Sequence, residues 1–297
     1  MRTHIKYFAL LLLSATTMYS ELFASSFGSL STVHIRNMDP DLIGLLGTDQ
    51  ITVMNPGQFS VLSSNQIAGF TSAQAPTIKS SHLAAVGSAA IAGLDPDTAA
   101  NLSTGAVSGG FTAGNVKGIT TAVLNGLGSD LIAVISSAAI NGLNSVQVTG
   151  FDTAQLVAGL STANVKGFNS ANAKGISTDV LAGLDSAVAG AFGSAGFSGM
   201  GSDQFGAFDS AVLIGGINTR NAPGITSANI TGISADILNS IGSSVYAKFN
   251  SASFGGLTTD QVGALDGNFF DSVGTTNYQG LPSGYLNFLD STVLQSI

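Results

Sequence analysis

The sequence predicts a repeat solenoid of stacked short capped helical turns, one for every eight residues. Three observations lead to this prediction. From Leu30 to Ile297 the chain divides into 33 units, and position 1 of each unit is a large apolar residue. Position 6 of each unit is also apolar, as at Ile35, Ile43 and Ile51. Position 2 is nearly always a residue that caps helices.

Three units have nine residues instead of eight, namely residues 102–110, 151–159 and 208–216. Each has an additional small residue directly before the next large apolar one, giving Gly109-Gly110 and Gly215-Gly216 in two of them. We interpret the additional residue as a local bulge that leaves the repeat register intact.

The eight-residue period excludes one long helix and one long strand. Apolar residues at i, i+5 and i+8 drift around a continuous helix and form no stable stripe. On a single strand, residues i and i+5 point to opposite faces. The chain must therefore bend in every unit.

The remaining positions indicate short helical turns. Position 2 is Ser, Thr, Asp, Asn or Gly in all units except those with Lys79 and Pro282. Position 3 accepts proline, which is tolerated at the first helical residue, in Pro40, Pro56 and Pro96. Position 5, three residues after the cap as in a capping box, is often glutamine: Gln50, Gln58, Gln66, Gln74, Gln155, Gln204 and Gln261.

Positions 1, 6 and 8 complete the unit. Positions 1 and 6 correspond to the two residues of a hydrophobic staple, and both are expected to turn inward. Position 8 is most often glycine, which suits a left-handed residue after the helix. The alternative is a right-handed β-solenoid with about three octapeptides per coil, since Ser, Thr, Asn and Gly also suit its corners.

The first residues differ from the repeat and are typical of a secretory signal peptide. Arg2 and Lys6 precede an apolar segment at residues 7–13, and Ala24 is a suitable cleavage position. We expect a signal peptide at residues 1–24 and a single solenoid domain at residues 25–297. Cleavage would remove Glu21, the only glutamate of the chain. The expected location is secreted or on the outer cell surface.

The composition agrees with export. The chain has no cysteine, 9 Lys and Arg residues, and 17 Asp and Glu residues. This acidic balance argues against nucleic acid and anionic membrane as partners. No segment after the signal is long and apolar enough for a membrane helix.

The sequence suggests no catalytic, cofactor-binding or metal site. His34 and His82 both occupy position 5 and are expected to be exposed or capping residues. Aspartates at positions 2 and 4 are explained by helix N-termini, although the pairs Asp39/Asp41 and Asp95/Asp97 are also considered as weak calcium ligands. Four cations at position 7 are expected to face solvent: Arg36, Lys117, Lys166 and Lys174.

Aromatic residues gather near the C-terminus. This segment is interpreted as a cap on the last coil, with an aromatic docking surface as the alternative. The residues concerned are Phe269, Phe270, Tyr278, Tyr285 and Phe288.

Some units resemble a known motif. Residues 257–264 read Leu-Thr-Thr-Asp-Gln-Val-Gly-Ala, and residues 160–167 read Leu-Ser-Thr-Ala-Asn-Val-Lys-Gly. They are similar to the Leu-Thr-Thr-x-Gln-Val-x-Ala octapeptides repeated in exported and surface proteins of Gram-negative bacteria. The resemblance implies an exported location and carries over no functional residue.

We therefore expect a non-enzymatic secreted or cell-envelope protein that acts in adhesion, in a surface coat or in a self-assembled structure. Its expected partners are further copies of itself or a component of a host or cell surface. One alternative is a solenoid that binds an extracellular ligand such as a glycan. A second is a polysaccharide-active enzyme on a β-solenoid.

Overall fold

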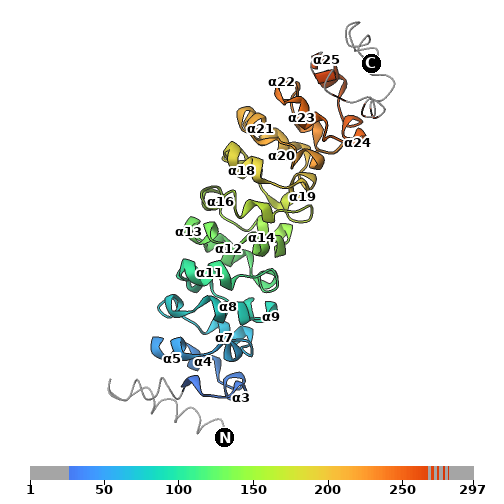
Figure 1. The fold of residues 1–297 in the computed structure, drawn as a ribbon. Helices are drawn as coiled ribbons and strands as arrows, with labels where there is room; N and C mark the ends of the chain where they lie inside the picture. Colours follow the sequence, from blue (N-terminus) through green and yellow to red (C-terminus); the bar gives the residue numbers. More distant parts are fainter. Residues whose placement is uncertain (1–26, 267–268, 271–272, 274–276, 278–279, 281–297) are drawn as a thin grey trace. The chain divides into compact units, whose positions relative to one another are not determined.

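The protein is built from short helices. The computed structural model describes residues 27–266 together with Phe269, Phe270, Val273, Asn277 and Gly280 (Figure 1). This part contains 23 α-helices and six 3-10 helices, and no strand. The prediction of a helical repeat solenoid is confirmed, and the alternative of a β-solenoid is wrong. The signal peptide proposed for residues 1–24 lies outside the described residues.

Capping residues begin the helices as expected. The Ser63 hydroxyl accepts a hydrogen bond from the Gln66 N–H, and the Gln66 side chain accepts one from the Ser63 N–H at 2.9 Å. Helices α4 (Pro40–Ile43), α6 (Pro56–Phe59) and α10 (Pro96–Ala100) begin at the three prolines of position 3. The local sequence therefore determines where a helix starts, because the cap satisfies N–H groups that have no partner within the helix.

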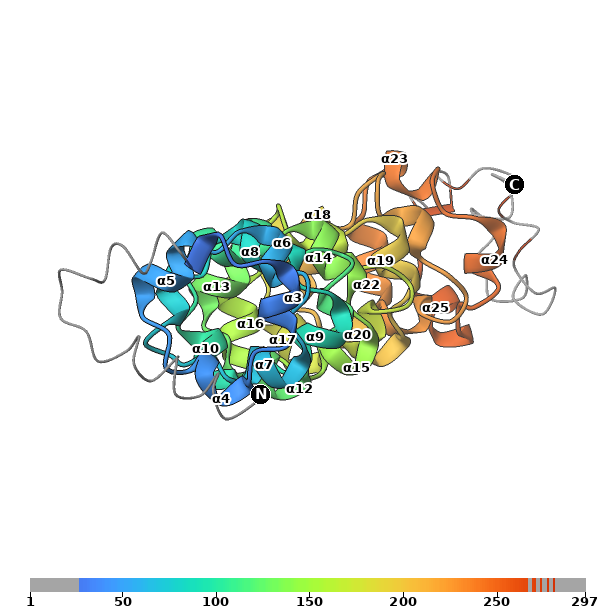
Figure 2. The same cartoon turned by 90° about the horizontal axis from the view of Figure 1, so that it is seen from below.

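The chain divides into two compact units, of which the first comprises residues 1–143 and 150–155. Its helices pack in three runs (Figures 1 and 2). The first run is α3 (Thr32–Arg36), α6, α8 (Ser80–Ala85), α11 (Thr104–Gly110) and α13 (Ser129–Ala133). The second run is α4, α7 (Ser64–Ala68), α9 (Ser88–Ile91), η2 (Val116–Gly118) and α14 (Ser137–Gly142). In the third, α5 (Thr48–Val53) packs on η1 (Ala75–Thr77) and α10 packs on α12 (Thr121–Gly126).

The second compact unit comprises residues 144–149 and 156–297. Its longest run is η3 (Val165–Gly167), α18 (Ser186–Ala191), α21 (Ser210–Gly216), α22 (Ala235–Ser240) and α25 (Thr259–Ala264). A second run is α17 (Thr178–Ala182), α20 (Ser202–Ala207) and η6 (Ile230–Gly232). In addition, α15 (Ser145–Val148) packs on η4 (Ala173–Gly175), and α19 (Ser194–Ser198) packs on η5 (Ala222–Gly224). Helices α23 (Ser243–Tyr246) and α24 (Ser251–Phe254) also belong to this unit, whereas α16 (Thr153–Gly159) begins in the first unit.

The helices that pack closely against each other are three elements apart in the chain, as α8 and α11 are. One coil within each compact unit thus contains three repeats. Positions 1 and 6 supply its core: Leu62 and Ile67 of the unit around α7 are both 4% exposed. Because a helix of four to seven residues is marginal by itself, this packing supplies most of its stability.

Position-8 glycines are required for a reason that the sequence analysis missed. No described residue has a positive φ, so the prediction of left-handed glycines is wrong. Instead, a Cβ at Gly69 would lie 2.6 Å from the Pro40 carbonyl oxygen of the preceding coil. A Cβ at Gly118 would likewise overlap the Ser88 carbonyl oxygen. These glycines allow consecutive coils to approach through their backbones.

The nine-residue units also differ from expectation. Their additional residue does not form a bulge but lengthens the helix to seven residues in α11, α16 and α21. In α11 the additional glycine lies against the preceding coil, since a Cβ at Gly110 would be 2.6 Å from the Leu83 Cβ. In α21 a Cβ at Gly216 would be 2.9 Å from the Ala189 Cβ. The insertion therefore produces a close helix-to-helix contact.

Asparagine at position 5 changes the type of helix. Where position 5 is asparagine, the unit forms a turn followed by a 3-10 helix of three residues. Five of the 3-10 helices follow this rule, and the asparagines that precede them are Asn115, Asn164, Asn172, Asn221 and Asn229.

Candidate functional surface

Most position-5 polar side chains are part of the fold, because they connect consecutive coils. The Gln66 amide donates to the carbonyl oxygens of Met38 and Ile35, 28 and 31 residues earlier, at 2.8 Å each. Gln261 repeats the arrangement with Ile233 and Ile230, at 2.7 and 2.9 Å. Each side chain also accepts from the N–H of its own position-2 residue. We refer to these bridges as the polar ladder. A buried amide is costly unless its groups are paired, and here they are.

Shorter polar side chains at position 5 also belong to the polar ladder, because they donate to backbone carbonyls of a preceding coil. The Thr98 hydroxyl donates to the Phe70 carbonyl at 3.0 Å, and the Ser253 hydroxyl donates to the Ile225 carbonyl at 2.6 Å. Asn115 donates to the carbonyls of Leu83 and Gly110. Serines, threonines and asparagines of this position are thus occupied inside the coils.

The two histidines have different environments. His34 is exposed, and its Nδ1 lies 2.8 Å from the Ser31 hydroxyl, which agrees with the expected capping role. His82 is buried, so of the two expected environments, exposed or capping, it has the capping one. Its Nδ1 accepts from the Lys79 N–H at 3.2 Å, and its Nε2 donates to the Met54 carbonyl at 2.9 Å. These partners select the neutral ring, and burial lowers the pKa of His82.

The ring of His82 also stacks on Phe59, with centroids 4.2 Å apart. Its environment is therefore that of a core residue in the polar ladder. No open side of the ring is available for a substrate or a metal ion.

The aspartates of the two candidate calcium pairs cap helices. The Asp39 carboxylate accepts from the Asp41 N–H at 3.2 Å, and the Asp95 carboxylate accepts from the Asp97 N–H at 2.9 Å. Within residues 27–266 and the few described beyond them, no three or more His, Cys, Asp or Glu side chains gather in a way that could hold a metal ion.

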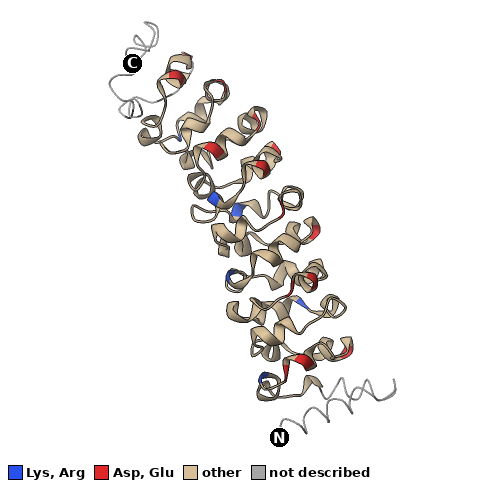
Figure 3. Ribbon diagram, turned by 180° about the vertical axis from the view of Figure 1, so that it is seen from behind, with Lys and Arg blue, Asp and Glu red and all other residues tan. Residues whose placement is uncertain are grey.

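The cations of position 7 are exposed as expected, at Arg36, Lys117, Lys166 and Lys174. Figure 3 shows that charged residues are sparse and that most of the ribbon carries none. Lys79 is the exception at position 2, and its ammonium group donates to the Thr52 carbonyl at 2.8 Å. This lysine therefore connects two coils.

The described C-terminal aromatic residues are buried, not displayed. Phe269 and Phe270 are 1% and 2% exposed, and Phe269 packs edge-on against Tyr246 with centroids 4.8 Å apart. The alternative of an aromatic docking surface is thus wrong for these two residues. Tyr278, Tyr285 and Phe288 lie outside the described residues.

The exposed surface carries a row of hydroxyl groups. Along the first run of the first compact unit, position 3 carries a hydroxyl group in four of the five helices, at Thr32 in α3, Ser80 in α8, Thr104 in α11 and Ser129 in α13, and is Pro56 in α6. None of these side chains is buried. Stacked helices lie about 8–10 Å apart, so the hydroxyl groups of Ser80, Thr104 and Ser129 follow one another at about that interval, whereas Pro56 separates Thr32 from them.

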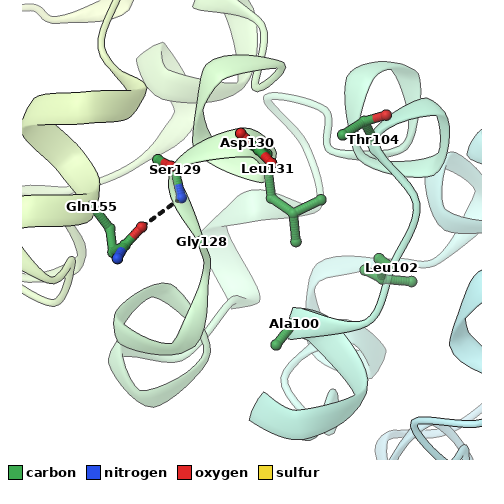
Figure 4. Close-up of a pocket in the computed structure, with 8 residues that line it drawn as sticks. All are labelled: Ala100, Leu102, Thr104, Gly128, Ser129, Asp130, Leu131 and Gln155. Atoms are coloured by element: carbon green, nitrogen blue, oxygen red, sulfur yellow. Dashed lines mark hydrogen bonds between the residues drawn. The ribbon is translucent and has the colours of Figure 1, made fainter.

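One groove opens on this row in the first compact unit. It has a volume of about 350 Å³ and combines four polar side chains, those of Thr104, Ser129, Asp130 and Gln155, with apolar parts of Ala100, Leu102 and Leu131. Figure 4 shows Gln155 reaching toward Ser129 on one side, with Thr104 and Leu102 across the groove. This groove was not predicted from the sequence. The available signal was the nine-residue unit, which contains Gln155.

Comparison with known proteins does not extend this description. The chain matches no protein-family model, and no curated protein matches it. Among the described helices, none has the length and apolar character needed to cross a bilayer.

Proposed function

We propose that the protein is a non-enzymatic, exported repeat protein that acts at the cell surface in adhesion, in a surface coat or in a self-assembled structure. The observation that carries this proposal is that most polar side chains at positions 2 and 5 form hydrogen bonds within the fold itself. Those of position 5 mostly connect coils, and those of position 2 cap helices, as Gln66 and Ser63 do. What remains for partners is the repetitive outer surface, including the hydroxyl row.

A repetitive surface is suited to repetitive partners. Solenoids present extended surfaces on which one weak contact recurs in every coil. Many weak contacts on one chain give high avidity when the partner has matching spacing, as a polymer or an array of copies does. Further copies of this protein or a component of a host or cell surface are therefore the proposed partners.

Location is the first test. Cells that produce the protein are fractionated, intact cells are treated with protease, and the protein is detected by antibody. The proposal expects a cell-associated protein that protease removes from intact cells. A periplasmic protein as the control should survive the same treatment. Recovery in the cytoplasm alone would contradict the proposal.

Glycan binding is the second candidate function, and the row formed by Thr32, Ser80, Thr104 and Ser129 favours it. Polysaccharide binding is expected to depend on several residues of such a row together. The enzyme alternative was linked to a β-solenoid, and the described residues lack that scaffold.

A further inference from the structure

The groove beside Gln155 lies within the first compact unit, where its lining comes from successive coils. Thr104 begins α11, Ser129 and Asp130 begin α13, and Gln155 lies in α16. These helices occupy corresponding places in three consecutive coils. The groove therefore follows the direction of the hydroxyl row.

Gln155 departs from the polar ladder. Most of the other described glutamines of position 5 turn inward, and Gln66, for example, is 1% exposed, whereas Gln50 is half-buried and caps its own helix at Gly47. Gln155 is exposed, and its side-chain oxygen accepts from the Ser129 N–H at 2.8 Å. It belongs to a nine-residue unit, and in another such unit position 5 is the apolar Val212. In the third such unit position 5 is Ala106, which is buried, so among the three nine-residue units Gln155 is the one polar side chain at position 5, and it lies at a groove.

The polar groups of the groove remain available for a ligand. Within the described part of the chain, the hydroxyl groups of Thr104 and Ser129 and the carboxylate of Asp130 have no hydrogen-bond partner. The side-chain nitrogen of Gln155, Nε2, has no hydrogen-bond partner there either, because the side-chain bond to Ser129 is made by Oε1. Hydroxyl, carboxylate and amide groups together can both donate and accept hydrogen bonds.

The lining also limits the chemistry of the ligand. Asp130 is the one charged residue of the groove, so an anionic ligand would be repelled. Leu102 and Leu131 are 4% and 6% exposed, so only small apolar parts of their side chains line the groove and can contact the C–H groups of a sugar ring. A volume of about 350 Å³ is at the small end of ligand pockets and suits one or two sugar rings.

We propose that this groove is a binding subsite for a neutral saccharide unit of a glycan chain. Asp130 and Gln155 hydrogen-bond its hydroxyl groups, and Thr104 and Ser129 extend the contact along the coils. The subsite rests on the proposed role at the cell surface, because that is where the chain meets glycans.

The test is titration of the purified, isotopically labelled protein with cellotriose, chitotriose, maltotriose, mannotriose and galactotriose, followed by NMR of the backbone amides. At least one trisaccharide should shift the resonances of Ser129, Asp130 and Gln155 in a saturable manner. The variants D130N and Q155A should each weaken that binding by about tenfold, the effect of one or two lost hydrogen bonds. Thermal unfolding should be unchanged by either variant.

The matched control is D179N, because Asp179 occupies the same position of α17 and does not line this groove. This variant should bind as the unaltered chain does. If none of the five sugars shifts these resonances at millimolar concentration, or D179N weakens binding equally, the subsite is wrong. Shifts produced by Ca²⁺ and not by sugar would also overturn it. A protein that binds no sugar but is removed by protease from intact cells would leave the proposed surface role standing.

Discussion

Two regions of the first compact unit join their coils in different ways. At α7 the coil is connected to the preceding ones by a side chain, since Gln66 bridges to the carbonyl oxygens of Ile35 and Met38. At α11 position 5 is Ala106, and the contact with α8 is made directly at Gly110. Close approach at a glycine occurs in both regions, since a Cβ at Gly69, directly after α7, would lie 2.6 Å from the Pro40 carbonyl oxygen. The region at α7 thus has a polar bridge in addition to the close approach, whereas the region at α11 has the close approach without a polar side chain at position 5.

The largest effect is expected from Gln66→Leu. Leucine has a similar size but can neither donate nor accept, so the Met38 carbonyl oxygen and the Ser63 N–H lose their hydrogen-bond partner, whereas the Ile35 carbonyl oxygen keeps the Met38 N–H. Each unpaired buried group costs about 1–3 kcal/mol, and we expect a total loss of about 3 kcal/mol. Urea unfolding measures it. The control Gln155→Leu changes the same residue type at an exposed site and should stay within about 0.5 kcal/mol.

Gly110→Ala should have the next largest effect. The new methyl group would lie 2.6 Å from the Leu83 Cβ, so α8 and α11 must separate. Overpacking of this kind costs about 1–3 kcal/mol. Gly87→Ala, where a Cβ meets nothing within 4 Å, is the control. Equal unfolding midpoints for the two variants would show that close approach does not hold α11 in place.

A smaller effect depends on pH and concerns His82. Its pKa is lowered in the folded chain, mainly by burial, so the unfolded chain binds the proton more readily. The contribution of His82 to the free energy of unfolding is therefore fully present at pH values above its ordinary pKa of 6.5, and it decreases as the pH falls below that value. The hydrogen bond to Met54 raises the pKa and partly offsets burial, whereas the charge of Lys79 lowers it further. The variant H82Q places the usual glutamine there, and its thermal unfolding should lose this part of the pH dependence. Parallel pH profiles for the two proteins would contradict the assignment.

The smallest expected effect is a gain in the free energy of unfolding from the substitution Gly87→Ser. Gly87 is the N-cap of α9 with φ −72° and ψ 160°, and it supplies no side-chain hydrogen bond. A serine fits this conformation and can cap the helix, which should add about 0.5 kcal/mol. Calorimetry of this variant should show a higher midpoint. Gly118→Ser should instead lower the midpoint, because the serine Cβ would overlap the Ser88 carbonyl oxygen.

These comparisons indicate how far the sequence can be interpreted. The helix starts at Pro40, Pro56 and Pro96 and the buried pair Leu62/Ile67 follow from caps and apolar spacing, which act within one unit. The role of position 8 could not be predicted in the same way, because Gly69 meets Pro40 29 positions away. The groove at Gln155 was missed for a related reason. Gln155 occupies the same position of its unit as the glutamines of the polar ladder. In the sequence it differs from them only in belonging to a nine-residue unit.

The sequence by itself determined that the chain repeats every eight residues, that each unit begins with a cap, and that positions 1 and 6 face inward. These features depend on neighbours within a few residues, whose preferences are local. Only the tertiary structure decided that three units make a coil and that position 5 bridges to carbonyls 28 and 31 residues earlier. The tertiary structure also decided that glycine serves close approach and not a left-handed turn. The physical reason is that these contacts join residues whose separation depends on the coil size, which the packing of whole units determines.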